Sequence, residues 1–555
     1  MLRRRLFLAL SSAILLIVSF PNFNQPWCAW VALLPWLLLL QEVSDTSQSG
    51  TSARHFVRAF WWSYVVGLVF FFGSIWWLIH VTFVGLIALC LYLALYFGCF
   101  GWFVCKVLDQ RQETRDQKLK TQDPRRFSAL SLVSSLMSHV SSLIVIPSAW
   151  VALEYLRSYM LLLGFGWNLL GYSQSPSLSA IQLADVTGVW GVSFLLIMMN
   201  VALLAFLREQ DLRRRLVCVG LAVGATLAAW SYGQLRLKQE GSGVTIRMAV
   251  VQGNIPQGEK WSAAFRESIL QRYEHLTQEA ATQSPQLIIW PETSVPGYLG
   301  LDELDEDVTA RVQHLAQSVK VPLLVGAPMG TLVGKVIRPT NSAALLDETG
   351  HIVSRYDKLH LVPFGEFVPF ESVFPWLRKL LPPIGAFIPG HDYTVFQPSG
   401  LPAFGVLVCF EDIFPSLARG FVRHGAQWLI TITNDAWFGR SAAAYQHAQA
   451  STFRAVELRM PMVRAANTGW SGCIDAKGRW LSSVRNQQGE ELFVGGIALC
   501  ETALDKTRTL YQRWGDWFAG LCLLLAIGWL VATASKGVLP LKGVACGCVR
   551  IDGVI

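Results

Sequence analysis

The chain begins with long apolar runs that alternate with short basic segments. Seven runs precede residue 240, and each approaches the ~20 residues that a helix needs to cross a bilayer: residues 6–20, 27–40, 60–81, 84–107, 130–155, 190–207 and 216–232. The first run is similar to a signal peptide, but no small-residue cleavage site follows it, so we expect an uncleaved span. An eighth run covers residues 517–534.

Between the seventh and eighth runs the pattern changes to short apolar segments separated by helical periodicity. Strands are expected at residues 244–252, 286–290, 321–327, 404–408, 427–433 and 462–467, and a hairpin-like pair at 341–346 and 351–356. Helices are expected at residues 261–283, 308–319 and 413–424. Several of these strands end in unusual polar residues, so the pattern predicts an α/β sandwich with a site along one rim.

Composition supports an integral membrane protein. Of 555 residues, 52% are hydrophobic and only 15% are charged, which is too apolar for an ordinary soluble protein. The net charge of +8 does not indicate nucleic-acid binding, because the basic residues gather beside the apolar runs, where they orient spans.

The basic segments give a consistent topology. If residues 3–5 stay in the cytoplasm, the loops at 54–58, 106–126 and 208–215 lie on the same side, and each is locally basic. An odd number of spans then places the sandwich on the external face and both termini in the cytoplasm. The expected parts are a seven-helix bundle (1–240), an external domain (241–507), an eighth span (508–535) and a cytoplasmic tail (536–555).

The cysteines of the external domain predict neither a disulfide nor a metal site. Cys409, Cys473 and Cys500 form no even framework, and none has metal-ligand spacing to a histidine or another cysteine. We therefore expect no structural disulfide, no zinc and no cofactor.

Three residues of different chemistry follow predicted extended segments: Glu292, Lys358 and Cys409. A thiol needs a base or a neighbouring cation to become a nucleophile, and a carboxylate and an ammonium supply both. Glu292 would carry the proton, and Lys358 would stabilise an oxyanion. Each residue alone has an ordinary explanation, as a turn cap, a solvated lysine or a core cysteine.

The three come with longer motifs: WPET at 290–293, YDKLHLVPFGE at 356–366 and CFED at 409–412. In this order they resemble the Glu-Lys-Cys signatures of the nitrilase superfamily, whose fold is an αββα sandwich. With seven preceding spans and one following, the chain resembles its membrane-integrated branch, the bacterial apolipoprotein N-acyltransferases. Further matches are QGNIPQGEKW at 252–261, TNDAWFG at 433–439, RAANTGWSG at 464–472 and YQRWGDW at 511–517.

The resemblance implies a two-step transfer at the external face of the bacterial inner membrane. Cys409 would take an acyl chain from a phospholipid, expected to be phosphatidylethanolamine, and hold it as a thioester. The α-amine of a diacylglyceryl-cysteine on an apolipoprotein would then accept the chain. No cofactor is implied, and the protein is expected to act as a monomer in the lipid bilayer.

The resemblance also implies supporting residues. Glu366 would hold the lysine, Glu411 and Phe410 would shape the surroundings of the thiol, and Trp261 and Trp437 would either lie near the substrate entrance or pack in the rim. The segment 367–389 is rich in aromatic and aliphatic residues, so we expect it to dip into the bilayer surface.

Two charged features of the membrane part are expected to have no catalytic role. Glu154 and Arg157 share one helical face and are expected to form a structural pair near the external interface, with phospholipid headgroup binding as the alternative. The long charged loop at 109–126 is expected to be a solvated insertion.

Two rival functions remain open at this point. A membrane-anchored nitrilase or amidase would use the same three residues on small soluble compounds, but it would need neither seven spans nor an apolar arm. A transporter with a large external binding domain would tolerate replacement of Glu292, Lys358 and Cys409.

Overall fold

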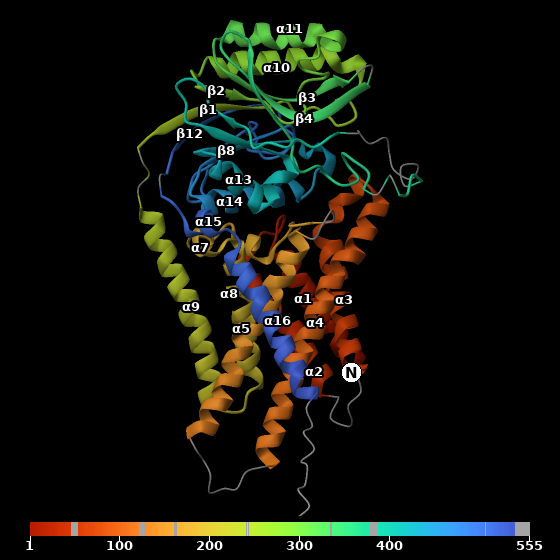
Figure 1. Ribbon diagram of the computed structural model, residues 1–555, viewed down its shortest axis with the longest axis vertical. Helices are drawn as coiled ribbons and strands as arrows, with labels where there is room; N and C mark the ends of the chain where they lie inside the picture. Colours follow the sequence, from red (N-terminus) through yellow and green to blue (C-terminus); the bar gives the residue numbers. More distant parts are fainter. Residues whose placement is uncertain are drawn as a thin grey trace, which may run out of the picture.

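The computed structural model describes residues 1–45, 54–120, 129–159, 164–239, 241, 243–333, 336–369, 371, 373–376, 387–505 and 507–538. Two parts are stacked along its long axis: a bundle of long helices below and an α/β sandwich above (Figure 1). The predicted tail beyond residue 538 and part of the insertion, residues 121–126, lie outside the described residues.

The lower part consists of apolar helices that lie roughly along one direction (Figure 1). They are α1 (Leu2–Val18), α2 (Leu34–Asp45), α3 (Arg54–Ser74), α4 (Phe83–Lys120), α5 (Ala129–Tyr159), α8 (Val189–Arg208), α9 (Leu212–Lys238) and α16 (Trp517–Val538). Among the described residues, six helical stretches are long and apolar enough to cross a membrane: Pro26–Asp45, Arg54–Ser74, Phe83–Gln110, Val189–Arg208, Leu212–Lys238 and Trp517–Ala534. The number of eight spans and the external position of the sandwich stay predictions.

The upper part contains two six-stranded sheets. One has the order β12-β1-β2-β3-β4-β5 and the other β11-β10-β9-β8-β7-β6. The strands are β1 (Thr245–Gln252), β2 (Leu287–Ile289), β3 (Leu323–Val333), β4 (Val336–Leu346), β5 (Ile352–Asp357), β6 (Val395–Phe396), β7 (Phe404–Val408), β8 (Trp428–Thr433), β9 (Met462–Ala466), β10 (Gly472–Ile474), β11 (Trp480–Ser483) and β12 (Gly496–Ala503).

Helices cover both outer faces of this sandwich, so the predicted α/β sandwich is confirmed. The helices α10 (Arg266–Ala281) and α11 (Asp302–Val319) lie on the side away from the bundle (Figure 1). The helices α13 (Pro415–Arg423) and α14 (Ala443–Leu458) lie between the second sheet and the bundle (Figure 1). The central strands β7, β8 and β9 are parallel and buried throughout, as expected of strands covered on both faces.

The bundle and the sandwich are joined by buried hydrogen bonds. The Gln446 side chain on α14 accepts from the indoles of Trp77 (3.0 Å) and Trp167 (2.9 Å) and donates to the carbonyls of Ser74 (3.0 Å) and Pro21 (3.2 Å). Because these groups are shielded from water, losing any of them would leave an unpaired polar atom. The sandwich is therefore fixed against the membrane helices.

A disulfide between Cys473 on β10 and Cys500 on β12 links the two sheets, so the expectation of no disulfide was wrong. Both cysteines are fully buried, and their Cα atoms are 5.7 Å apart. The odd count in the sequence was misleading because Cys409 lies elsewhere, at the end of β7. The other two cysteines meet only because their strands belong to sheets that pack face to face.

Replacing Cys473 and Cys500 together by alanine is expected to lower the free energy of unfolding by about 3 kcal/mol, since 27 positions separate the linked residues. The melting temperatures of the variant and the wild type in detergent measure the loss, and a reductant should affect only the wild type. Two freely alkylated thiols at these positions in unreduced, unfolded wild-type protein would contradict the bond.

The apolar segment 367–389 is described only in part. Of its hydrophobic residues, Val373 (65% exposed), Phe374 (46%), Trp376 (56%) and Ile388 (37%) show exposed side chains, whereas 370, 372 and 377–386 lie outside the described residues. The structure thus places part of a predicted lipid-contacting segment at the surface of the sandwich.

Candidate active site

Cys409 lies where β7 ends. It adopts φ 56° and begins the short 3-10 helix η6 (Cys409–Ile413), so the chain turns sharply at the thiol. A non-glycine residue in this left-handed region is destabilised by about 1–2 kcal/mol, and such residues are concentrated at functional sites. Because all five residues of β7 are buried, the strand gives the cysteine a rigid support.

Glu292 and Lys358 lie side by side at the same rim, one after β2 and the other directly after β5. The Lys358 Nζ is 3.6 Å from the Glu292 Oε1, and both side chains are buried. The Glu292 oxygens accept hydrogen bonds from the Asn341 Nδ2 (2.7 Å) and the Asn434 backbone N–H (2.8 Å). Glu292 is therefore held in one orientation.

Glu366 pairs with Lys358, which is the contact that the resemblance implied. The Lys358 Nζ donates to the Glu366 Oε1 at 3.0 Å and lies 2.9 Å from the Oε2. Burial alone would lower the pKa of Lys358, but the carboxylates of Glu366 and Glu292 outweigh burial and hold that pKa above its ordinary value. A permanent ammonium thus lies in the site, suited to stabilising a developing oxyanion.

The surroundings of Cys409 do not stabilise its thiolate form. Burial, followed by the neighbouring Glu292 carboxylate, raises the pKa of the thiol well above its ordinary value, and Lys358 opposes this rise only in part. A nucleophile with a raised pKa needs a base at the moment of attack. Glu292 and Lys358 both act on the pKa of the thiol, so the three residues lie near one another, and their catalytic roles stay predictions.

Glu411 connects the turn at Cys409 to the segment that carries Lys358. Its buried carboxylate accepts from the backbone N–H groups of Val408 (2.7 Å), Leu359 (2.7 Å) and His360 (3.0 Å) and from the Tyr356 hydroxyl (3.0 Å). Burial raises the pKa of Glu411 to about 7. Because one side chain holds the residues that flank both Cys409 and Lys358, it fixes their separation.

Phe410 lies on the bundle side of the thiol. Its ring contacts Phe165, which belongs to a loop of the membrane part, with centroids 6.2 Å apart, and Phe414 at 5.3 Å. Trp261 and Trp437 are instead 54% and 45% exposed. Their exposure leaves them available to a substrate, and that role stays a prediction.

Two buried residues of the site were not predicted from the sequence. Asn341 in the middle of β4 bridges Glu292 and Glu366 through one Nδ2, at 2.7 Å to each. Lys260, which is 3% exposed, donates from its Nζ to the Glu292 carbonyl at 2.9 Å. Lys260 falls inside the motif at 252–261, but a lysine between glutamate and tryptophan gives no sign of burial.

Lys260 should make stability depend on pH. Burial lowers its pKa to about 7, although Glu292 and Cys409 partly oppose this effect. Between about pH 7 and pH 10 the unfolded chain binds this proton and the folded protein does not, so folding becomes more favourable as pH rises. Melting temperatures of the wild type and Lys260→Met should therefore diverge in favour of the wild type over this range. A difference that is independent of pH would contradict the lowered pKa.

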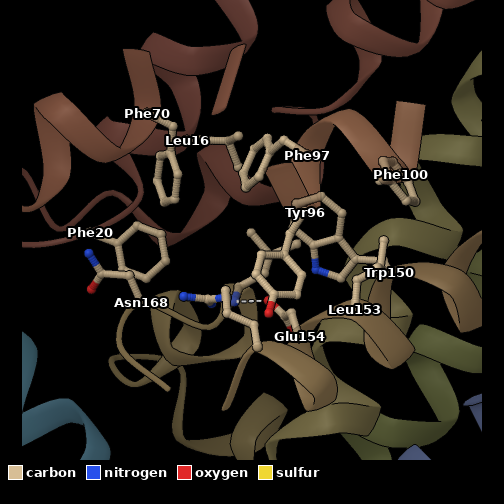
Figure 2. Close-up of a pocket in the computed structure, with 12 residues that line it drawn as sticks. Leu16, Phe20, Phe70, Tyr96, Phe97, Phe100, Trp150, Leu153, Glu154 and Asn168 are labelled. Carbon is tan, nitrogen blue, oxygen red and sulfur yellow. Dashed lines mark hydrogen bonds between the residues drawn. The ribbon is translucent and has the colours of Figure 1, made fainter. Parts of the chain in front are cut away.

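Glu154 and Arg157 line an apolar cavity between the membrane helices and the loop at 164–170 (Figure 2). Arg157 donates to the carbonyls of Phe165 (3.1 Å) and Trp167 (2.8 Å), and the Glu154 Oε1 accepts from the Leu170 N–H (2.7 Å). The pair thus fixes the loop that contacts Phe410, which agrees with a structural role.

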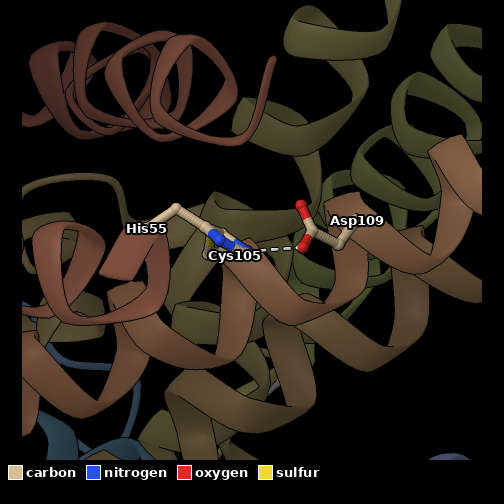
Figure 3. Close-up of side chains that lie close together, drawn as sticks. All are labelled: His55, Cys105 and Asp109. Carbon is tan, nitrogen blue, oxygen red and sulfur yellow. Dashed lines mark hydrogen bonds and ion pairs between the residues drawn. The ribbon is translucent and has the colours of Figure 1, made fainter. Parts of the chain in front are cut away.

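One group among the described residues could hold a metal ion: His55, Cys105 and Asp109, whose ligand atoms lie within 4.8 Å of one another (Figure 3). The His55 Nε2 is already paired with the Asp109 Oδ2 at 2.6 Å, and the Asp109 Oδ1 accepts from Ser44 at 2.5 Å. These residues lie on α2, α3 and α4 of the bundle, whereas Cys409 belongs to the sandwich, so they take no part in the chemistry at Cys409.

Comparisons with known proteins agree with the two-part architecture. Residues 247–506 match the carbon-nitrogen hydrolase family, and residues 12–202 match the apolipoprotein N-acyltransferase N-terminal domain. The chain is 36% identical over 537 residues to the apolipoprotein N-acyltransferase of Geobacter metallireducens, covering 94% of each chain. It is 31% identical over 561 residues to that of Chlorobaculum tepidum, covering 95% of this chain and 96% of the relative. An amidase structure from Nesterenkonia sp. AN1 is similar at 18% identity and a TM-score of 0.35, covering 53% of this chain and all of the amidase.

Proposed function

This chain belongs to the apolipoprotein N-acyltransferase family, and we propose that it carries one acyl chain from a phospholipid to an apolipoprotein through a thioester on Cys409. The observation that carries the mechanism is the burial of Glu292, Lys358 and Cys409 together at one rim of the sandwich.

In the first half-reaction, Cys409 attacks the ester carbonyl of a phospholipid. Glu292 takes the thiol proton as the C–S bond forms, and the Lys358 ammonium stabilises the oxyanion of the tetrahedral intermediate. The ester C–O bond then breaks, and Glu292 returns the proton to the leaving oxygen. The products are an acyl-enzyme and a lysophospholipid.

In the second half-reaction, the free α-amine of a diacylglyceryl-cysteine attacks the thioester. Glu292 takes one amine proton as the C–N bond forms, and the C–S bond breaks with that proton returned to sulfur. The apolipoprotein leaves with an amide-linked third chain, and the thiol is restored. Because the site is buried, aminolysis is favoured over hydrolysis by bulk water.

The surface of the sandwich suits a lipid substrate. Trp261, Phe374, Trp376 and Trp437 expose large apolar side chains on the sandwich, which suits contact with lipid. In this proposal the sandwich lies on the external face of the inner membrane with both termini in the cytoplasm. Phosphatidylethanolamine is the donor, and the protein acts as a monomer.

The proposal is tested with purified protein, phosphatidylethanolamine carrying a labelled sn-1 chain, and a diacylated lipoprotein peptide. The peptide should gain the mass and label of one acyl chain, and Cys409→Ala should transfer none. Hydrolysis of small soluble amides with no gain of mass by the peptide would favour a membrane-anchored amidase instead.

A further inference from the structure

A second cluster of charged side chains contacts the turn that begins at Cys409. Asp412, Asp435, His447 and Arg464 are all at most 1% exposed. Arg464 lies 2.7 Å from Asp412 and 3.1 Å from Asp435, and His447 lies 2.8 Å and 3.0 Å from the same two carboxylates. Two carboxylates thus face one guanidinium and one imidazole, and the guanidinium also lies 2.7 Å from the His447 Nδ1, to which it can donate.

His447 also reaches the backbone of the nucleophile. Its Nε2 lies 3.2 Å from the Cys409 carbonyl oxygen and 2.8 Å from the Asp412 Oδ1. Both neighbours accept hydrogen bonds and cannot donate, so Nε2 carries a hydrogen in either charge state of the ring. Burial and Arg464 act to lower the pKa of His447, but the two carboxylates outweigh them and raise it.

The His447 ring also contacts the membrane part. The Trp167 indole packs against the His447 imidazole, with centroids 5.1 Å apart. Trp167 is itself held by Arg157 of α5 through its carbonyl (2.8 Å) and by Gln446 through its Nε1 (2.9 Å). One continuous set of contacts therefore runs from a helix of the bundle to the carbonyl of Cys409.

We propose that His447 is a positioning residue for the acyl transfer: it holds the Cys409 carbonyl and so keeps the cysteine in its left-handed conformation, with the Trp167 indole fixing the ring. The inference rests on the proposed role of Cys409 as the nucleophile. Without the hydrogen bond, the strained turn can relax, and a shift of about 1 Å at the reacting atom can lower a rate by roughly 100-fold.

The test compares two variants whose side-chain amides reach different distances into the space that the imidazole fills. In His447→Gln the side-chain amide nitrogen can take the place of Nε2 and still donate to Cys409, whereas in His447→Asn it cannot reach that far. The rate of thioester formation is expected to fall by roughly 100-fold in His447→Asn, with KM for phospholipid unchanged, and to recover largely in His447→Gln.

Alkylation of Cys409 by iodoacetamide gives a second readout that needs no lipid, so it separates a failure of this inference from a failure of the acyl-transfer proposal. Equal defects in the two folded variants, or thioester formation and alkylation at wild-type rates in His447→Asn, would overturn the positioning role. If neither variant folds, Trp167→Leu decides, since it leaves the hydrogen bonds of the cluster intact. It should slow both reactions about tenfold, and unchanged rates would overturn the proposal.

Discussion

Glu292→Gln is expected to slow transfer of an acyl chain to Cys409 by about 1000-fold. The reason lies in the raised pKa of the Cys409 thiol, which leaves almost no thiolate at neutral pH and makes attack depend on a base. Glutamine preserves the size of the side chain but cannot take a proton. The rate of appearance of the acyl-enzyme in a single turnover, followed by intact mass, measures the effect.

Glu279→Gln is the matched control for this substitution, since Glu279 is an exposed glutamate on α10. It should acylate at the wild-type rate. A melting temperature of Glu292→Gln close to that of the wild type would separate chemistry from folding. An acylation rate in a folded Glu292→Gln within about tenfold of the wild type would show that another group removes the proton.

Lys358→Met is expected to lower the same rate by about 100- to 1000-fold, which is the usual effect of removing one oxyanion donor. The Lys358 side chain is 1% exposed and its Nζ is held by Glu366, so the ammonium is already in place when negative charge develops. Because this interaction strengthens only in the transition state, the rate constant should fall while KM for phospholipid changes little.

Lys358→Arg should not restore the rate, because the larger guanidinium must fit a buried slot between Glu292 and Glu366. Lys320→Met, at an exposed lysine, serves as the control and should be fully active. Wild-type activity in a folded Lys358→Met would remove the lysine from the mechanism.

The rim of the site could be predicted because strand ends are visible in the sequence. Glu292 follows the apolar run of β2 after two residues, and Cys409 follows the apolar run of β7 directly. The two strands belong to the two sheets of the sandwich, and both residues lie beyond the carboxyl ends of their strands. The carboxylate that pairs with Lys358 was likewise implied by the family motif. Chemistry carried by short contiguous motifs is thus accessible before the fold is known.

The parts that escaped prediction depend on contacts between distant segments. Every residue of α14 except Tyr445 is buried, so this helix has no exposed polar face to reveal its period, and His447 within it shows no sign of its partners. The strands β10, β11 and β12 were not predicted either, because they are defined by hydrogen bonds to neighbouring strands rather than by a pattern in their own residues. The Cys473–Cys500 bond was missed for the same reason.

The most direct test of a covalent route through Cys409 is the intact mass of the purified protein after incubation with phospholipid in the absence of apolipoprotein. The wild type should gain the mass of one acyl chain on Cys409, lose it on treatment with hydroxylamine, and pass it to an added diacylated peptide. Cys409→Ala should gain nothing. An acylated peptide formed by the wild type with no adduct on Cys409 at any time, or formed by Cys409→Ala, would contradict the thioester mechanism.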